Sequence, residues 1–195
     1  MQTENMYGTY FSNPLSDLIQ NENYSRSTQV YVNAFADIKL WKGLVFRTEY
    51  AANYNYNTGY RFTPSYDYEF FKQQSSASRS AGNGSNWTLK TYLTYNGTFG
   101  KHNVSVMAGH EAQENNWESL DGSRTNFLFN SVHELNAGDA TTAKANSSRG
   151  SSAIESYFGR LNYNFADRYL LTATLRADGS SSFAKESRWG WFPSV

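Results

Sequence analysis

Length, composition and charge exclude several classes of protein. The chain has 195 residues, which fits one domain, and both its aromatic and its charged residues make up 17%. Seventeen Lys and Arg balance 17 Asp and Glu, so the basic excess that nucleic-acid binding requires is missing. The chain has no cysteine, which excludes disulfides, thiolate metal sites and a thiol nucleophile.

Six segments alternate apolar and polar residues, as strands with one apolar face do. In the first, Val32 and Ala36 share one face, and Phe35 and Asp37 share the other. The predicted strands cover residues 28–40, 44–56, 87–99, 103–113, 156–165 and 169–178. Each reaches the roughly 9–11 residues that a tilted transmembrane strand needs.

The connections alternate in length. Three are short turns, centred near Lys42, Lys101 and Asp167. Residues 57–86 and 114–153 are polar and weakly patterned, and they predict long loops. Two Asp-Gly-Ser triplets, at residues 121–123 and 178–180, predict further turns. Short turns at one end and long loops at the other are typical of an outer-membrane β-barrel, with the turns in the periplasm.

Aromatic residues gather beside the short turns. Amphipathic rings concentrate where hydrocarbon meets headgroups, so these residues predict a girdle on the turn side of a membrane. The group consists of Trp41, Phe46, Tyr95, Phe99, Tyr163, Phe165 and Tyr169.

The last hairpin also carries a family resemblance. Residues 156–183 read SYFGRLNYNFADRYLLTATLRADGSSSF, and residues 188–194 read RWGWFPS. Weaker matches are Asn13, Pro14 and Leu15 before the first strand, and FGKHN at residues 99–103. Together these blocks resemble the barrel of SusC/RagA-type TonB-dependent outer-membrane transporters.

The resemblance implies an all-β fold, an antiparallel transmembrane barrel of about 22 strands around a plug domain. Residues 1–195 are then expected to supply about six strands of that barrel, with the plug and remaining strands elsewhere. The start of the chain lacks a signal-peptide pattern, which also predicts an internal piece of a longer protein. The implied partners are a SusD-like surface lipoprotein, the TonB complex acting through the plug, outer-membrane lipid, and an oligosaccharide or peptide substrate. The implied location is the outer membrane of a Gram-negative, Bacteroidetes-like cell.

Enzymatic chemistry finds no support in the sequence. His102, His110 and His133 are far apart and have no second ligand at the spacing of a known metal site. Nothing singles out a catalytic pair among the carboxylates, and no nucleophile elbow or phosphate-binding loop occurs. We therefore expect no catalytic residue, no metal and no cofactor.

Two groups of residues are candidates for contact with a substrate or a plug. Arginine or lysine aimed at mid-bilayer lipid costs roughly 2–4 kcal/mol, so polar-face residues of a barrel must face the lumen. The lumen-facing candidates are Arg47, Glu49, Lys90, Arg160, Asn162, Asn164 and Arg176. The second group, aromatic residues expected in exposed loops, consists of Tyr60, Tyr66 and Trp117.

Two alternatives compete with an active transporter. A passive porin-like barrel shares the strand pattern and lacks the plug. A soluble β-sandwich that binds carbohydrate through Trp and Tyr would bury its apolar faces against each other.

Overall fold

A computed structural model describes residues 3–4, 10–11, 21–68 and 71–195. The sequence match at Asn13, Pro14 and Leu15 lies outside the described residues. Among the helices of the described part, none is long and apolar enough to cross a membrane.

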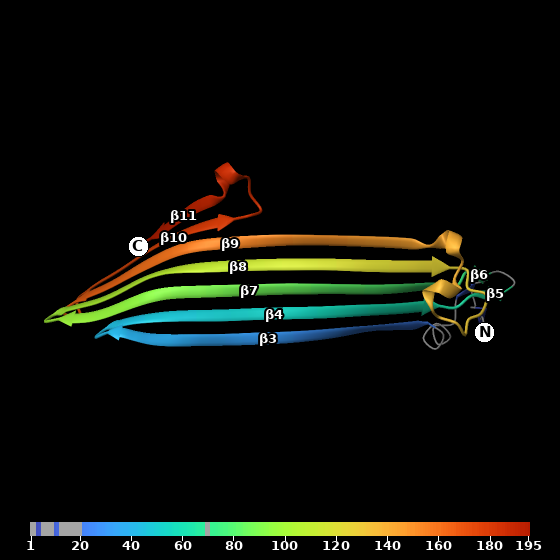
Figure 1. The fold of residues 1–195 in the computed structure, drawn as a ribbon, viewed down its shortest axis with the longest axis horizontal. Coiled ribbons are helices and arrows are strands. Elements are labelled where there is room, and N and C mark those ends of the chain that lie inside the picture. Colours follow the sequence, from blue (N-terminus) through green and yellow to red (C-terminus); the bar gives the residue numbers. More distant parts are fainter. Residues whose placement is uncertain (1–2, 5–9, 12–20, 69–70) are drawn as a thin grey trace. The chain divides into compact units, whose positions relative to one another are not determined.

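Seven strands form the main sheet, in the order β11-β10-β9-β8-β7-β4-β3 (Figure 1). They are β3 Glu22–Trp41, β4 Leu44–Thr63, β7 Ser76–Phe99, β8 His102–Thr125, β9 Lys144–Phe165, β10 Tyr169–Ser180 and β11 Trp189–Ser194. Two small sheets pair β1 Thr3–Glu4 with β2 Tyr10–Phe11, and β5 Tyr66–Tyr68 with β6 Phe71–Gln73. Three 3-10 helices complete the described elements: η1 Leu135–Ala137, η2 Ala140–Thr142 and η3 Lys185–Ser187. All six predicted strands are present, and β11 is a seventh.

The chain divides into two compact units. The turn unit comprises residues 29–55, 84–117 and 150–195, and it holds all three short connections. The second unit comprises residues 1–28, 56–83 and 118–149. It holds the far ends of the long strands together with the segments that join them.

The predicted long loops are wrong over much of their length. β4 continues to Thr63, β7 begins at Ser76 and β8 continues to Thr125. These stretches are rich in Ser, Asn, Thr and Gly, which local propensity assigns to turns. Pairing with neighbouring strands outweighs that preference, because strand propensity depends strongly on context.

Both Asp-Gly-Ser triplets lie in strands, so their assignment as turns is also wrong. Gly179 pairs with Glu155 on β9 and with Trp189 on β11. A Cβ atom on Gly179 would lie 2.8 Å from Cε2 of Trp189. The glycine is therefore explained by the indole ring that lies across it, a close approach that glycine permits inside a strand.

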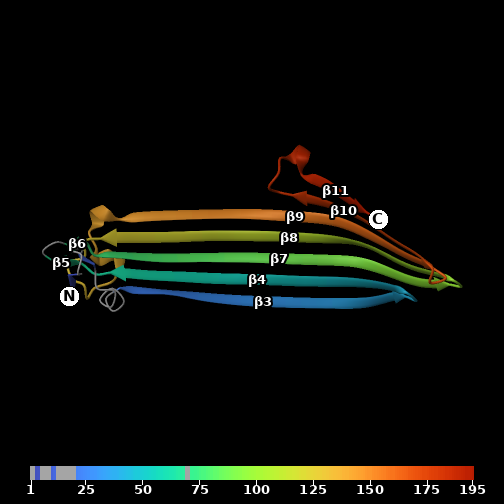
Figure 2. The same ribbon diagram turned by 180° about the vertical axis from the view of Figure 1, so that it is seen from behind.

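The three short turns lie at one end of the turn unit, as both views show (Figure 1, Figure 2). Gly43 and Gly100 adopt positive φ angles of 81° and 59° in the first two turns. In the third, Ala166 and Asp167 have φ angles of 53° and 55°, and the Arg168 N–H donates to the Phe165 carbonyl at 3.0 Å. Two consecutive residues at positive φ define a tight hairpin turn of the type that matches strand twist.

Ala166→Gly is expected to stabilise the protein by roughly 0.5–1 kcal/mol, because glycine adopts positive φ without steric cost. Ala173→Gly is the matched control, since Ala173 pairs with Leu161 in mid-strand. There the same change should destabilise by roughly 0.5–1 kcal/mol. Denaturant unfolding of both variants in one lipid system measures the two changes in the free energy of unfolding. Changes of the same sign would contradict the turn geometry.

The register of β9 with β10 confirms the predicted faces of the last hairpin. Leu161 pairs with Ala173, and Tyr163 pairs with Leu171. Directly opposite residues of an antiparallel pair share a face, so the apolar sets of both strands coincide. The polar sets coincide in the same way, as in the pairs Asn162–Thr172 and Arg160–Thr174.

The second unit has a small core of its own. Tyr60, Phe62, Ala77 and Phe127 are each less than 7% exposed, and Phe62 meets Phe127 edge-on at 5.5 Å. The Phe127 N–H donates to the Ser75 hydroxyl at 2.7 Å, and that hydroxyl lies 3.4 Å from the Phe127 carbonyl oxygen. Asp139 caps η2 by accepting from Thr141, and these hydrogen bonds lower the pKa of its carboxyl group. Residues 126–143 are therefore packed against the ends of β4 and β7.

Candidate functional site

The polar face of the turn unit carries a network that begins at Arg47 on β4. Its guanidinium contacts Glu49 at 2.5 Å through Nε and Asp37 on β3 at 3.3 Å through Nη1. It also lies 4.7 Å from the centre of the Phe35 ring. Glu49 accepts a second hydrogen bond, 3.1 Å long, from the Tyr92 hydroxyl on β7. The network therefore joins three strands on one face.

A second cluster surrounds Glu111 on β8. Glu111 lies 3.4 Å from Nζ of Lys90 and 3.7 Å from Nη2 of Arg176, and its side chain is only 17% exposed. Arg176 also donates to Asp178 at 2.7 Å and to the buried Ser156 hydroxyl at 2.9 Å. Lys90 and Arg176 thus each have an acidic partner. A charge shielded from water without such a partner would be destabilising.

Aromatic rings connect the two clusters. The rings of Tyr92 and Phe158 are 6.5 Å apart, and the Arg176 guanidinium lies 5.8 Å from the Phe158 ring. Phe158 fits because its neighbour on β8 is Gly109, whose added Cβ would lie 2.6 Å from the Phe158 ring. We call this set the polar band; its charged members are Asp37, Arg47, Glu49, Lys90, Glu111, Arg176 and Asp178. The polar band crosses six strands, from β3 to β10.

Four of the predicted lumen-facing residues belong to the polar band: Arg47, Glu49, Lys90 and Arg176. Arg160 shares its face through the pairing with Thr174, and Asn162 accepts a hydrogen bond from Thr172 at 3.0 Å. Asn164 instead bonds Asp167 in the hairpin turn. Sequence reasoning missed Glu111, Tyr92 and Phe158. Alternation alone places Tyr92 and Phe158 on the polar face. Glu111 lies in the predicted strand whose alternation of polar and apolar residues is least regular.

The aromatic residues predicted in loops lie in strands, so that part of the prediction is wrong. Tyr60 is in β4, 5% exposed, with the Arg79 guanidinium 4.3 Å from its ring centre. Tyr66 is in the short strand β5. Trp117 is in β8, 47% exposed, against Gly150 of β9. Regular pairing replaces the loops expected from the polar composition.

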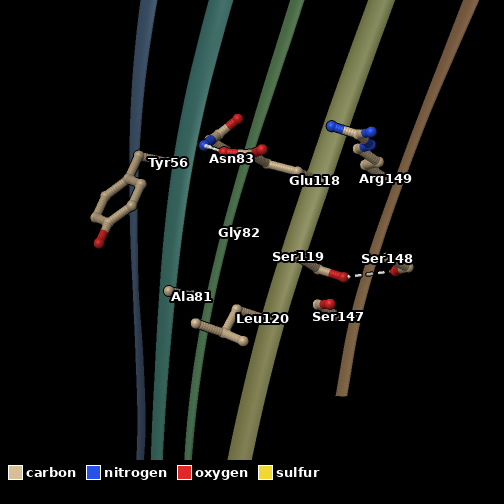
Figure 3. A pocket seen from close by; sticks show the side chains of 10 residues that line it. All are labelled: Tyr56, Ala81, Gly82, Asn83, Glu118, Ser119, Leu120, Ser147, Ser148 and Arg149. Carbon is tan, nitrogen blue, oxygen red and sulfur yellow. Dashed lines mark hydrogen bonds between the residues drawn. The ribbon is translucent and has the colours of Figure 1, made fainter. Parts of the chain in front are cut away.

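A cavity of about 700 Å³ lies in the second unit (Figure 3). In Figure 3, Asn83 donates to Glu118 at 2.6 Å, and the hydroxyls of Ser119 and Ser148 are 2.8 Å apart. The remaining lining residues are Tyr56, Ala81, Gly82, Leu120, Ser147 and Arg149. Hydroxyl, amide, carboxylate and guanidinium groups of this kind suit a polar ligand.

The coupling between Glu111 and Arg176 is expected to be about 0.5–1 kcal/mol, because partly exposed ion pairs contribute little. A double-mutant cycle of Glu111→Gln and Arg176→Gln, followed by denaturant unfolding of the intact protein, measures it. Arg168→Gln in the exposed turn is the control and should add to Glu111→Gln without coupling. Zero coupling between Glu111 and Arg176 would show that this ion pair does not contribute to stability.

Comparison with known proteins places this architecture in a class. No family model matches the chain. The chain is 32% identical over 97% of its length to TonB-dependent receptor P3 of Formosa agariphila. It is 34% identical over 56% of its length to TonB-dependent receptor SusC of Bacteroides thetaiotaomicron. The chain spans about a fifth of the first relative and 11% of the second.

Solved structures show the same fold. The RagAB peptide transporter superimposes with a TM-score of 0.89 and 21% identity, over 97% of this chain and 22% of that one. The class is therefore an antiparallel transmembrane β-barrel, of which this sheet is a fragment of the wall. The chain belongs to the SusC/RagA-type TonB-dependent receptors. The alternative of a soluble β-sandwich is wrong.

Proposed function

We propose that the chain forms part of an outer-membrane receptor that imports a large nutrient with energy from TonB. The observation that carries this proposal is the division of the turn unit into two faces. One face holds the polar band, and the other exposes Val32, Leu171 and Leu175. A barrel wall between lipid and a water-filled lumen needs apolar side chains outside and polar side chains inside, on alternating residues.

The substrate proposed is an oligosaccharide or a peptide. The name of the RagAB peptide transporter supports a peptide. Acidic and basic groups alternate along the polar band, which suits a substrate carrying both charges or many hydroxyls. A SusD-like surface lipoprotein is the proposed partner outside the cell, and the TonB complex is the proposed partner in the periplasm. The relatives are named as receptors, which supports a function in binding and transport.

Growth of a strain lacking the intact receptor, on defined peptides or oligosaccharides as sole nutrients, tests this proposal. Uptake should return with the wild-type gene and should be lost again when TonB is disabled. Uptake that persists without TonB would favour the passive porin-like barrel instead.

We also propose that residues 1–195 are part of the β-barrel domain, which strands outside them complete. β3 and β11 are the two edges of the main sheet, and unpaired edges promote aggregation. Residues 1–195 expressed alone should therefore aggregate in detergent, while the intact receptor stays monodisperse. A monomeric, heat-resistant species of residues 1–195 would contradict this proposal.

A further inference from the structure

A cavity of about 360 Å³ lies in the turn unit, where β7, β8, β9, β10 and β11 each contribute residues. Two indole rings, Trp87 and Trp189, line it together with Arg188, Glu114 and Glu155. The register Glu155–Gly179–Trp189 places Glu155 and Trp189 on the same face as Tyr157, Ala177 and Trp191. The cavity therefore opens on the apolar face, opposite the polar band.

The cavity lies at the edge of the apolar surface. Along β9, the apolar face runs from Phe165 beside the turn to Tyr157, and Glu155 is its first charged residue. The ten steps from Phe165 to Glu155, at about 3.3 Å each and tilted by about 40°, rise roughly 25 Å, the height of the apolar band of a barrel. Tyr157 and Trp189, with ring centres 5.9 Å apart, then stand where an interfacial aromatic girdle belongs.

Two charged side chains of the cavity have polar atoms that make no hydrogen bond among the described residues. Glu155 accepts from Tyr157 at 2.9 Å and contacts His110 at 3.1 Å, both through Oε1, which leaves Oε2 without a partner among the described residues. Arg188 uses only Nε, donating to the Phe183 carbonyl at 3.1 Å, so both of its terminal nitrogens are available within the described part. The cavity thus offers a cation and a carboxylate beside two indole rings.

We propose that this cavity binds the phosphoethanolamine headgroup of a membrane lipid. Arg188 would bind the phosphate through its two terminal nitrogens, the geometry in which arginine recognises phosphate. The ammonium would lie against Glu155, Glu114 and the indole faces, where carboxylates and π-systems both attract cations. The inference rests on the proposed function, because it requires the apolar face to lie in lipid.

Native mass spectrometry of the intact receptor tests this inference with three lipids of matched chains. Phosphatidylethanolamine should be retained roughly tenfold more than phosphatidylglycerol, which has no ammonium, because one charge-assisted hydrogen bond accounts for about that factor. Phosphatidylcholine should fall between them, since its ammonium cannot donate a hydrogen bond. Arg188→Gln should lower retention of all three lipids, and Glu114→Gln should lower only the preference for phosphatidylethanolamine.

Arg168→Gln, in the exposed turn, is the matched control and should change nothing. Heat-modifiable gel mobility shows whether each variant is a folded barrel. Equal retention of the ethanolamine and glycerol lipids by a folded receptor, or no effect of Arg188→Gln, would overturn the headgroup site and leave the transport proposal standing. A receptor that fails to enter bilayers would overturn the transport proposal itself.

Discussion

Leu161→Arg is expected to destabilise the intact receptor in bilayers by roughly 2–4 kcal/mol, because an arginine would then face mid-bilayer lipid. Leu161 lies between Tyr163 and Tyr157 on the apolar face and pairs with Ala173. The free energy of unfolding from liposomes, measured with denaturant, gives the effect directly.

The adjacent residue supplies the control. Asn162 lies on the opposite face, where its side chain bonds Thr172. Asn162→Arg should therefore change stability by less than about 1 kcal/mol, as substitutions at exposed polar positions usually do. Equal losses for the two variants would contradict the assignment of faces.

Gly43→Ala is expected to cost roughly 2–4 kcal/mol and to disturb the first turn. Gly43 has a φ of 81°, and its carbonyl accepts a 2.8 Å hydrogen bond from the Asn96 N–H. An added Cβ would collide with the Asn96 carbonyl oxygen, which is backbone and has little room to move. The unfolding free energy and the yield of folded barrel would both fall.

Gly100→Ala separates the two causes of that loss. Gly100 also has a positive φ, of 59°, but an added Cβ there meets nothing within 4 Å. Only the backbone cost of about 1–2 kcal/mol remains. Similar losses at both glycines would show that close approach to Asn96 plays no part.

The faces of the sheet could be predicted from the sequence, whereas the strand lengths could not. Alternation placed Leu161 and Asn162 on opposite sides because side chains in a strand change face at every residue. The same rule fails beyond Tyr56 and Gln113, where Asn, Ser, Thr and Gly are frequent and the alternation is weak. In those stretches the hydrogen bonds that keep the chain extended come from the neighbouring strand. Local composition does not indicate which segment that strand is.

Only part of the polar band could be predicted from the sequence, for a related reason. Arg47 and Glu49 lie two residues apart on one strand, so alternation brings them together. Glu111 meets Lys90 and Arg176 only through the order and register of separate strands. Similarly, the sequence placed Tyr60 in a loop because its contacts with Arg79 and Tyr24 come from other strands.

Spin labels at Leu161, Leu171 and Val32 of the intact receptor in bilayers provide the most direct test of an apolar face in lipid. Leu171 and Val32 are 44% and 50% exposed, so the labels have space. Lipid-facing labels should collide readily with dissolved oxygen and be shielded from a water-soluble nickel chelate. Immobilised labels that neither reagent reaches would mean that protein covers this face, and would contradict the barrel-wall account.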